Sequence, residues 1–433
     1  MRQKPQIGYL LPTRERVMAR RPEAAPLLEF AARAERLGYH SVWVGDSLLA
    51  RPRHDPLTLL AAVAARTQKV LLGTAVFLPA LRNPVVLAHQ LATLDQISEG
   101  RLVLGAGIAS DVPNIRAEFA AAGVPFEGRV GRMMEGLRLA RKLWTGEPVN
   151  WEGRWPVKDG VLGPTPYRPG GPPIWIAGSV RPALERAARH FDGWFANEAD
   201  LACWRGQWAE VQEILRDAGR DLSKFTAAIY VTLAIDEDKS RAEQRLDAFL
   251  EKYYGQPATA MRHRQACHAG PAAAAGQFLS GFVEAGASHV VVRFVGDHER
   301  QLDIFAGLRS QFGWQEGITM AVSIRPLHPV FVGEVAGIDC REPLSPDEVA
   351  AIEAGMDEYG VLVFRDQRIT DAEQIAFTRH FGELESYNTP GHIRKREDSR
   401  LGPGMADFSN LDKAGNIMSD EDRVWFFKLG DRL

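Results

Sequence analysis

Short apolar segments alternate with amphipathic segments of helical spacing from the N-terminus to about Phe312. Apolar runs that are each long enough for one buried strand cover residues 6–12, 41–46, 70–78, 101–108, 172–179, 225–235 and 288–296. Amphipathic runs at Pro26–Leu37, Pro56–Ala65 and Pro84–Ile97 predict helices between them. Strands this apolar, separated by helices, indicate a parallel sheet buried on both faces. So many repeats favour an α/β fold of the (β/α)8 TIM-barrel type over an open sheet.

The pattern changes after Phe312, where a short polar segment separates two regions of different composition. We expect a barrel over residues 1–312, a linker over 313–321 and a second domain over 322–433. In the second domain the periodicity predicts a helix at Ser345–Tyr359, a strand at 361–366 and a helix at Asp371–Phe381. Residues 385–423 are rich in Gly, Asp, Asn and Pro, which is typical of loops.

The composition is that of a soluble globular protein, with 45% apolar and 25% charged residues. A net charge of −3 gives no electrostatic footprint for nucleic acid or for an anionic membrane surface. The longest apolar run, Val70–Leu81, has 12 residues, whereas a membrane span needs about 20. We therefore expect neither a nucleic-acid partner nor a membrane.

The N-terminal segment enters a strand pattern at once and lacks the apolar core of a signal peptide. The three cysteines, Cys203, Cys267 and Cys340, are far apart and odd in number. They predict no disulfide framework and no metal cluster, which suits a reducing cytoplasm.

Two sequence runs carry a family resemblance, residues 82–107 (RNPVVLAHQLATLDQISEGRLVLGAG) and residues 172–197 (PPIWIAGSVRPALERAARHFDGWFAN). Both closely resemble the luciferase-like monooxygenases, and similar segments at 143–155 and 284–296 extend the resemblance over about residues 5–312. The resemblance implies a (β/α)8-barrel oxidoreductase that uses FMN or a deazaflavin.

The segment IAGS at 176–179 ends an apolar strand, and a helical pattern begins directly after it at Arg181. Gly178 lets the backbone approach a ligand closely, Ser179 offers a hydroxyl group, and the first N–H groups of the helix point at an anion. At the C-terminal face of a barrel this arrangement predicts a phosphate site. An ordinary helix N-cap without a ligand is the alternative.

The run VLLGTAVFL at 70–78 raises the question of where a flavin ring would lie. The resemblance implies a non-prolyl cis peptide here, with Thr74, Ala75 and Val76 as the candidates for contact with the ring. An ordinary buried strand is the alternative. Gly105 and Gly107, in LGAG, would leave room for the ribityl chain, although glycines in a βα turn need no ligand to explain them.

Three further residues are candidates for catalysis. Asp46 ends a strand at the catalytic face, where similar enzymes place an acidic residue, although it could equally cap the following loop. Many relatives have His next, but this chain has Ser47, which argues against a histidine role there. Arg293 ends a strand at the same face. Its two candidate roles are that of a substrate clamp and that of the buried partner of an acid. His89 lies on a helix among apolar residues and is more typical of a core histidine than of an acid or base.

The chain has no GxxxxGK[ST] phosphate loop and no GxGxxG that follows a strand and opens a helix, so no Rossmann-type NAD(P)H site is expected. Reduced flavin would come from a separate reductase, unless a nicotinamide binds only transiently.

The leading hypothesis for function rests on the resemblance. Reduced FMN would react with O2 to a flavin C4a-peroxide, which oxygenates a small organic substrate, with reduced flavin and substrate as paired donors. One alternative is hydride transfer from a reduced 8-hydroxy-5-deazaflavin coenzyme, and another is a catalytically dead barrel that acts as a binding or assembly module. The substrate is not evident from the sequence. The resemblance also implies a homodimer or a larger assembly through the barrel.

Residues 323–339, 359–385 and 427–433 resemble the taurine and 2,4-dichlorophenoxyacetate dioxygenases, which use Fe(II) and 2-oxoglutarate on a double-stranded β-helix. We expect Phe426–Leu429 to begin a strand. In that family, sequences like LGDRL precede the H-x-D that supplies two iron ligands. None of His328, His380 and His392 begins an H-x-D or H-x-E. We therefore expect an incomplete α+β fragment of that domain, without iron and inactive as a dioxygenase.

Overall fold

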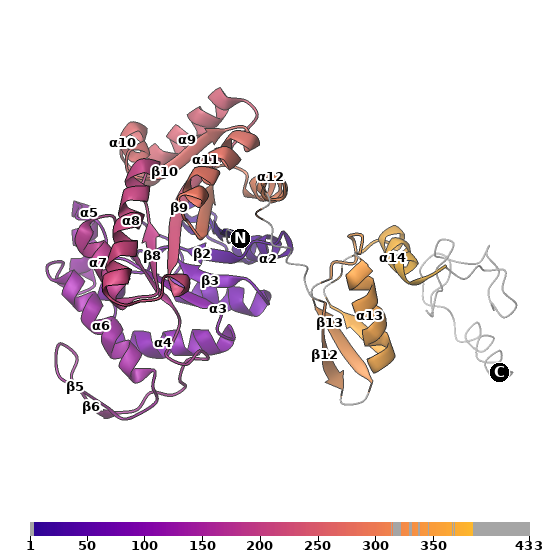
Figure 1. Cartoon of the computed structure of the whole chain (residues 1–433), viewed down its shortest axis with the longest axis horizontal. Helices are drawn as coiled ribbons and strands as arrows, with labels where there is room; N and C mark the ends of the chain where they lie inside the picture. The colour runs from indigo at the N-terminus through magenta and orange to yellow at the C-terminus, as the bar shows by residue number, and fades with distance from the viewer. Residues whose placement is uncertain are drawn as a thin grey trace, which may run out of the picture. The chain divides into compact units, whose positions relative to one another are not determined.

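The chain divides into two compact units, Met1–Glu316 and Gly317–Leu433 (Figure 1). The computed structural model describes residues 4–312 and 314 of the first unit, and 322–328, 331–336, 338–344, 346–365, 367 and 369–383 of the second. Several predictions concern residues outside these ranges. They are the linker apart from Trp314, the loop-like segment 385–423, His392 and the strand expected at Phe426–Leu429.

The first unit is a closed barrel of parallel strands, which confirms the predicted TIM barrel. Its strands, in order around the ring, are β1 (Gln6–Leu10), β2 (Ser41–Val44), β3 (Leu71–Thr74), β4 (Leu102–Ala106), β7 (Ile174–Ala177), β8 (Gly193–Ala196), β9 (Thr226–Ile235) and β11 (His289–Phe294). Pairing of β8 with β9, and of β11 with both β9 and β1, closes the ring. A further strand, β10 (Ala266–Gly270), pairs with the end of β9 beyond the ring.

Helices cover the outside of the strands (Figure 1). They are α1 (Thr13–Met18), α2 (Ala25–Arg36), α3 (Pro56–Arg66), α4 (Pro84–Ile97), α5 (Pro113–Ala121), α6 (Arg129–Leu143), α7 (Arg181–His190), α8 (Leu201–Asp217), α9 (Lys239–Tyr254), α10 (Ala258–Arg262), α11 (Ala272–Glu284) and α12 (His298–Gln311). Two of them begin where the sequence predicts, because Asp55 and Asn83 cap α3 and α4 and a proline occupies each first helical position.

Short elements fill some of the loops. They are η1 (Pro79–Leu81), the hairpin β5 (Val149–Trp151) with β6 (Val157–Gly160), and η2 (Leu222–Lys224). Most observed strands are shorter than the predicted apolar runs, because the C-terminal end of a run continues into the loop above the barrel. After β3, for example, only Phe77 pairs again, with Ala106.

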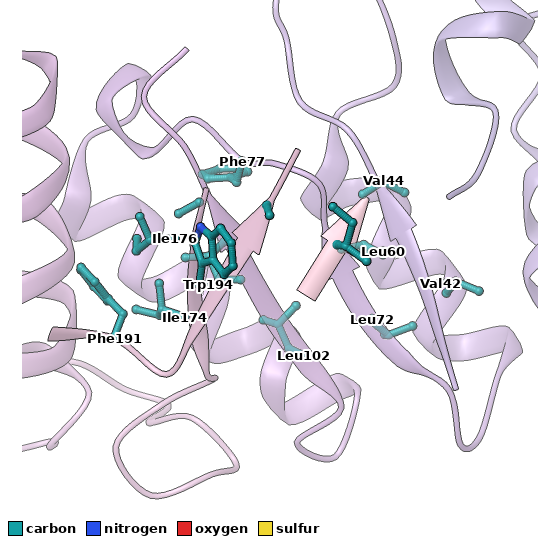
Figure 2. Packing of buried hydrophobic residues seen from close by; sticks show 14 of the residues in the cluster. Val42, Val44, Leu60, Leu72, Phe77, Leu102, Ile174, Ile176, Phe191 and Trp194 are labelled. Atoms are coloured by element: carbon teal, nitrogen blue, oxygen red, sulfur yellow. The ribbon is translucent and has the colours of Figure 1, made fainter. Parts of the chain in front are cut away.

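Side chains alternate along the strands between two apolar layers. One layer faces the helices and includes Val42, Leu72, Leu102 and Ile174 from four neighbouring strands (Figure 2). The other fills the barrel interior and consists of Leu10, Trp43, Val103, Trp175, Phe195, Ala228 and Val291. The interior is therefore packed, and a ligand can reach the barrel only at an open end.

The second unit is described by itself. Its sheet has the order β12 (Ser323–His328), β13 (Val332–Ala336) and β14 (Val361–Phe364), with an antiparallel and then a parallel pairing. The helices are α13 (Pro346–Tyr359) and α14 (Asp371–Thr378), followed by η3 (Arg379–Phe381). Its small core comprises Val335, Ile338, Cys340 and Ile352.

Two buried histidines support the first unit. His289, inside the barrel, has Nε2 at 2.8 Å from Ser41 Oγ and Nδ1 at 3.2 Å from Gln6 Oε1. Burial lowers the pKa of His289 to about 3. His298 Nδ1 lies 2.8 Å from Tyr9 Oη, and burial lowers the pKa of His298 to about 4. Both rings are therefore neutral in the folded barrel at pH 5, whereas they are protonated there once the chain unfolds.

We expect the barrel to lose stability as pH falls below about 6.5, because the unfolded chain takes up protons that the folded histidines refuse. The loss is about 2 kcal/mol per buried histidine between pH 6.5 and pH 5. Urea unfolding at these two pH values measures it. His289→Gln should show a smaller loss, whereas the surface variant His89→Gln should match the parent. An unchanged pH dependence in His289→Gln would contradict the prediction.

Candidate functional site

A cavity of about 410 Å³ lies at the C-terminal ends of the barrel strands. Its wall is formed by residues that end or follow β2, β3, β4, β7 and β8, and by side chains of β9, β11 and α9. This volume is within the range of small-molecule sites, and this face carries the active site in TIM-barrel enzymes. The cavity is therefore the candidate active site.

Gly178 and Ser179 line the cavity, at the turn between β7 and α7. Gly178 has φ +138°, and a Cβ added to it would lie 2.7 Å from Ala183 Cβ, so the turn requires glycine. The capping residue of α7 is Val180, whose side chain makes no capping hydrogen bond. Ser179 is therefore not the capping residue, and the capping position supplies no side-chain acceptor to the first N–H groups of the helix. Phosphate binding at this turn stays a prediction.

The segment after β3 contributes two of its three predicted residues to the cavity. The peptide between Ala75 and Val76 is cis, as expected, and both residues line the cavity. Thr74 does not line it, since its fully buried Oγ1 donates a hydrogen bond to the carbonyl of Gly105 at 2.8 Å. Thr74 thus holds β3 against β4 and lies behind the residues that face the cavity.

The two glycines of LGAG have different surroundings. Gly107 lines the cavity, and a Cβ added there would lie 2.6 Å from Val76 Cγ2. Gly105 does not line it, and an added Cβ would lie 2.0 Å from the carbonyl oxygen of Thr74. The neighbouring backbone thus accounts for the glycine at position 105, and room for a ligand there stays a prediction.

Asp46 lines the cavity but is bound on both oxygens. Arg82 donates to its Oδ2 and Oδ1 at 2.6 and 2.8 Å, and the N–H of Leu78 donates to Oδ2 at 2.9 Å. The Asp46 side chain is 1% exposed. Burial raises the pKa of this carboxyl, and the nearby Arg82 guanidinium offsets the rise only in part. Asp46 therefore ties the end of β2 to the segment between β3 and α4. These partners are not in the loop that follows β2, which the capping alternative named, and a catalytic role of Asp46 stays a prediction.

Ser47 is held by a carboxylate that no sequence motif indicated. Its Oγ donates to Glu118 Oε2 at 2.9 Å, and the N–H groups of Leu48 and Ala50 donate to Glu118 at 2.6 and 3.0 Å. Glu118 is 1% exposed, on α5. The pair fixes the loop after β2 at the rim of the cavity.

Arg293 lines the cavity near the end of β11 and has an acidic neighbour, while its role as a substrate clamp stays a prediction. Its Nη2 donates to Tyr253 Oη at 2.7 Å, and its Nε lies 3.4 Å from Glu15 Oε1. The residue is 4% exposed. Tyr253, like the other lining residues Arg51, Arg53 and Tyr254, carries no motif that would identify it in the sequence.

His89 lies on the solvent-facing side of α4, outside the cavity lining. The helix buries Leu87, Ala88 and Leu91, while Val86, three residues before His89, is 56% exposed. Helical geometry therefore places His89 on the exposed stripe. The interpretation of His89 as a core residue is therefore wrong, and the structure does not bring His89 to the candidate site.

In the second unit, His328 lies on β12, and His380 Nε2 accepts a hydrogen bond from the N–H of Leu344 at 3.3 Å. Among the residues that the structure describes, no three His, Cys, Asp or Glu side chains are grouped as a metal site would require. The expectation of no iron stays a prediction. No helix in the described parts of the chain is long and apolar enough to cross a membrane.

Comparison with protein families gives one match in each unit. A model described as luciferase-like monooxygenase matches residues 5–311, and a model described as taurine catabolism dioxygenase TauD, TfdA family matches residues 323–425. Both resemblances inferred from the sequence are confirmed.

Among curated proteins, the chain is similar to an F420-dependent glucose-6-phosphate dehydrogenase of Amycolatopsis mediterranei, at 32% identity over 50% of this chain and 67% of that protein. The protein of the same description from Nakamurella multipartita is 34% identical, over 50% of this chain and 66% of that protein. The chain thus spans about two thirds of the length of these relatives. Among solved structures, the monooxygenase RslO1 from Streptomyces bottropensis aligns with a TM-score of 0.61 and 24% identity, over 71% of this chain and 99% of that one. At this identity the likeness concerns the fold alone.

Proposed function

Because the chain belongs to the luciferase-like monooxygenase family, whose members are oxidoreductases, we propose that its barrel binds a reduced flavin cofactor and oxygenates a small organic substrate. The observation that carries the proposal is the meeting of two distant segments at one cavity. The Gly178–Ser179 turn and the Ala75–Val76 segment both line it. The first has the chemistry for a phosphate, and the second is the position that the family resemblance assigns to the ring.

The residues present fit such a cofactor. A phosphate group would bind at Gly178, Ser179 and the start of α7, where N–H groups and the helix dipole favour an anion. The ring system would lie against Ala75 and Val76, with Gly107 beside them. When bound, reduced FMN supplies electrons for oxygen activation, and a reduced deazaflavin supplies a hydride instead.

The protein's own contribution is placement and exclusion of water. Phe195, which packs in the barrel interior, also lines the cavity and closes its floor with an apolar surface. Asp46 holds Arg82 and the Leu78 N–H, so the segment that carries Ala75 and Val76 is fixed between β2 and α4. A rigid, apolar floor keeps water away from the reacting atoms and orients the substrate over the cofactor.

A second candidate is hydride transfer from a reduced deazaflavin without oxygen activation. The curated relatives favour it, since both are described as F420-dependent dehydrogenases and exceed 30% identity. Both candidates use the same cavity, so the cofactor distinguishes them.

Titration of the full-length protein with FMN and with an 8-hydroxy-5-deazaflavin, followed by absorbance and fluorescence, tests the proposal. We expect saturable binding of at least one of them. Rapid consumption of O2 by the reduced complex would support the monooxygenase, whereas binding without O2 consumption would support the deazaflavin candidate. Failure of both cofactors to bind would overturn the proposal and support a binding or assembly module.

Gly178→Ala should weaken cofactor binding about tenfold or more, which corresponds to at least about 1.4 kcal/mol. The added Cβ meets Ala183 and the variant residue disfavours φ +138°, so the turn must shift away from the phosphate position. Gly219→Ala is the matched control, because Gly219 also has positive φ, at +63°, but no atom within 4 Å of an added Cβ. Equal dissociation constants for Gly178→Ala and the parent would show that the turn does not hold the cofactor.

A further inference from the structure

Arginine side chains from different elements converge on one tyrosine in the cavity. Arg53, in the loop after β2, places Nη2 3.3 Å from Tyr253 Oη, and Arg293 of β11 places Nη2 2.7 Å from the same oxygen. The Arg293 guanidinium also lies 4.1 Å from the centre of the Tyr253 ring. Arg51 lies beside this group, over the ring of Tyr254 at 5.3 Å. Arg51, Arg53 and Arg293 are called the arginine clamp below.

The clamp has more positive charge than the surrounding protein neutralises. Within the described part of the chain, neither Arg51 nor Arg53 has a carboxylate within 4.0 Å. Arg293 Nη1 is buried and has no hydrogen-bond partner among the described residues, and its Nε meets Glu15 only at 3.4 Å. Asp46, the one acidic residue of the cavity wall that the structure describes, is already paired with Arg82.

A buried guanidinium with unsatisfied donors is costly unless an anion accepts from it. Arginine prefers oxyanions, because its planar fork can donate two parallel hydrogen bonds to a carboxylate, sulfonate or phosphate. Arg293, with its buried unpartnered donors, and Arg51 and Arg53, which have no carboxylate partner among the described residues, all line the same cavity. The clamp therefore has the chemistry of an anion site.

The clamp is separate from the Gly178–Ser179 turn. In the ring of strands, β11 is followed by β9, β8 and then β7, so Arg293 stands three strands away from that turn. The proposed function, on which this inference rests, places the phosphate of the cofactor at the turn. An anion at the clamp then belongs to a second molecule in the cavity.

We propose that the substrate is an organic acid anion, and that Arg53 and Arg293 grip its carboxylate, sulfonate or phosphate group. Arg51 adds positive charge at the rim. Tyr253 orients both guanidinium groups from α9 through its hydroxyl. The uncharged part of the substrate then extends from the clamp towards the segment at Ala75–Val76.

Calorimetric titration of the full-length protein at low ionic strength tests this inference. The probes are hexanoate, hexane-1-sulfonate and hexyl phosphate, with hexan-1-ol as the neutral counterpart, each added with and without saturating cofactor. We expect at least one anion to bind about tenfold or more tightly than hexan-1-ol. Arg53→Gln should weaken that binding about tenfold or more, and Arg53→Lys, which keeps the charge, should lose less. Comparison of the three anions identifies the acid group.

Arg205→Gln is the matched control, because Arg205 is exposed on α8 and lies outside the cavity wall. It should bind the anions like the parent protein. Anion binding that is unchanged in Arg53→Gln, or no tighter than that of hexan-1-ol, would overturn the inference. Failure of every cofactor to bind would count against the proposed function and not against this inference. The titrations without cofactor test the role of Arg53 whether or not a cofactor binds.

Discussion

Asp46→Ala should lower the free energy of unfolding of the barrel by about 3–5 kcal/mol. The substitution leaves the Arg82 guanidinium, whose side chain is 16% exposed, without the two hydrogen bonds that it donates to the carboxylate. It also leaves the N–H of Leu78 without its acceptor. Removing one partner of a buried pair costs more than the pair itself contributes, because the remaining charge stays desolvated. Urea unfolding at pH 7 measures the loss.

Two controls separate this role from catalysis. Asp55 is a weaker partner of Arg82, because its side chain is 51% exposed and lies 3.8 Å from Arg82 Nη2. Asp55→Ala should therefore lower the free energy of unfolding much less than Asp46→Ala. Asp55 also caps α3, and the loss of this cap adds its own smaller decrease. The double variant Asp46→Leu with Arg82→Met removes both charges and should recover much of the stability. Normal stability of Asp46→Ala together with lost oxidoreductase activity would instead make Asp46 a catalytic residue.

The barrel and the location of its cavity are predictable from the sequence, because both follow from local patterns. Apolar runs of strand length with helices between them leave few arrangements other than a parallel barrel. The carboxyl ends of parallel strands gather at one face. Residues that end such runs, such as Asp46, Gly178 and Arg293, must therefore lie near one another, and all three line the cavity.

The partners of these residues could not be predicted, because they come from distant parts of the chain. Arg82 is 36 residues from Asp46, Glu118 is 71 residues from Ser47, and Tyr253 is 200 residues from Arg53. Glu118 and Tyr253 belong to no recognisable motif, and nothing in the run 82–107, which Arg82 begins, indicates Asp46 as its partner. For Asp46, the family resemblance indicated an acidic residue near the cofactor. The structure shows that both oxygens of its carboxylate already accept hydrogen bonds from Arg82 or Leu78.

Two differences between the predicted and the observed structure, at His89 and at β10, have a local cause. On α4, the apolar neighbours of His89 suggested a buried position, yet Val86 on the same stripe is itself largely exposed. The strand β10 escaped detection because its sequence, ACHAG, contains no run of large apolar residues. It forms because the long strand β9 extends beyond its pairing with β8 and offers free backbone groups there.

The family resemblance and the structure give different reasons for the glycine at position 105. Gly105→Ala should destabilise the barrel by about 3 kcal/mol, at the upper end of overpacking costs. Its Cβ would lie 2.0 Å from the carbonyl oxygen and 3.3 Å from the carbonyl carbon of Thr74, and backbone in a closed barrel cannot move aside as a side chain can. The one close contact of a Cβ at Gly107 is the methyl group Val76 Cγ2 at 2.6 Å, which belongs to a side chain, so we expect a smaller loss of stability for Gly107→Ala.

Cofactor binding should show the opposite order. Gly107 lines the cavity and Gly105 does not, so Gly107→Ala should raise the cofactor dissociation constant, while the folded fraction of Gly105→Ala should bind like the parent. Gly206→Ala, on the exposed surface of α8 with no atom within 4 Å of an added Cβ, controls for the change from glycine to alanine and should stabilise slightly. Should Gly105→Ala unfold like the parent protein yet lose the cofactor, then Gly105 contacts the ligand and the packing explanation is wrong. Loss of stability with retained binding would instead place the constraint on Gly105 in the contact between β3 and β4, which must form before any cofactor can bind.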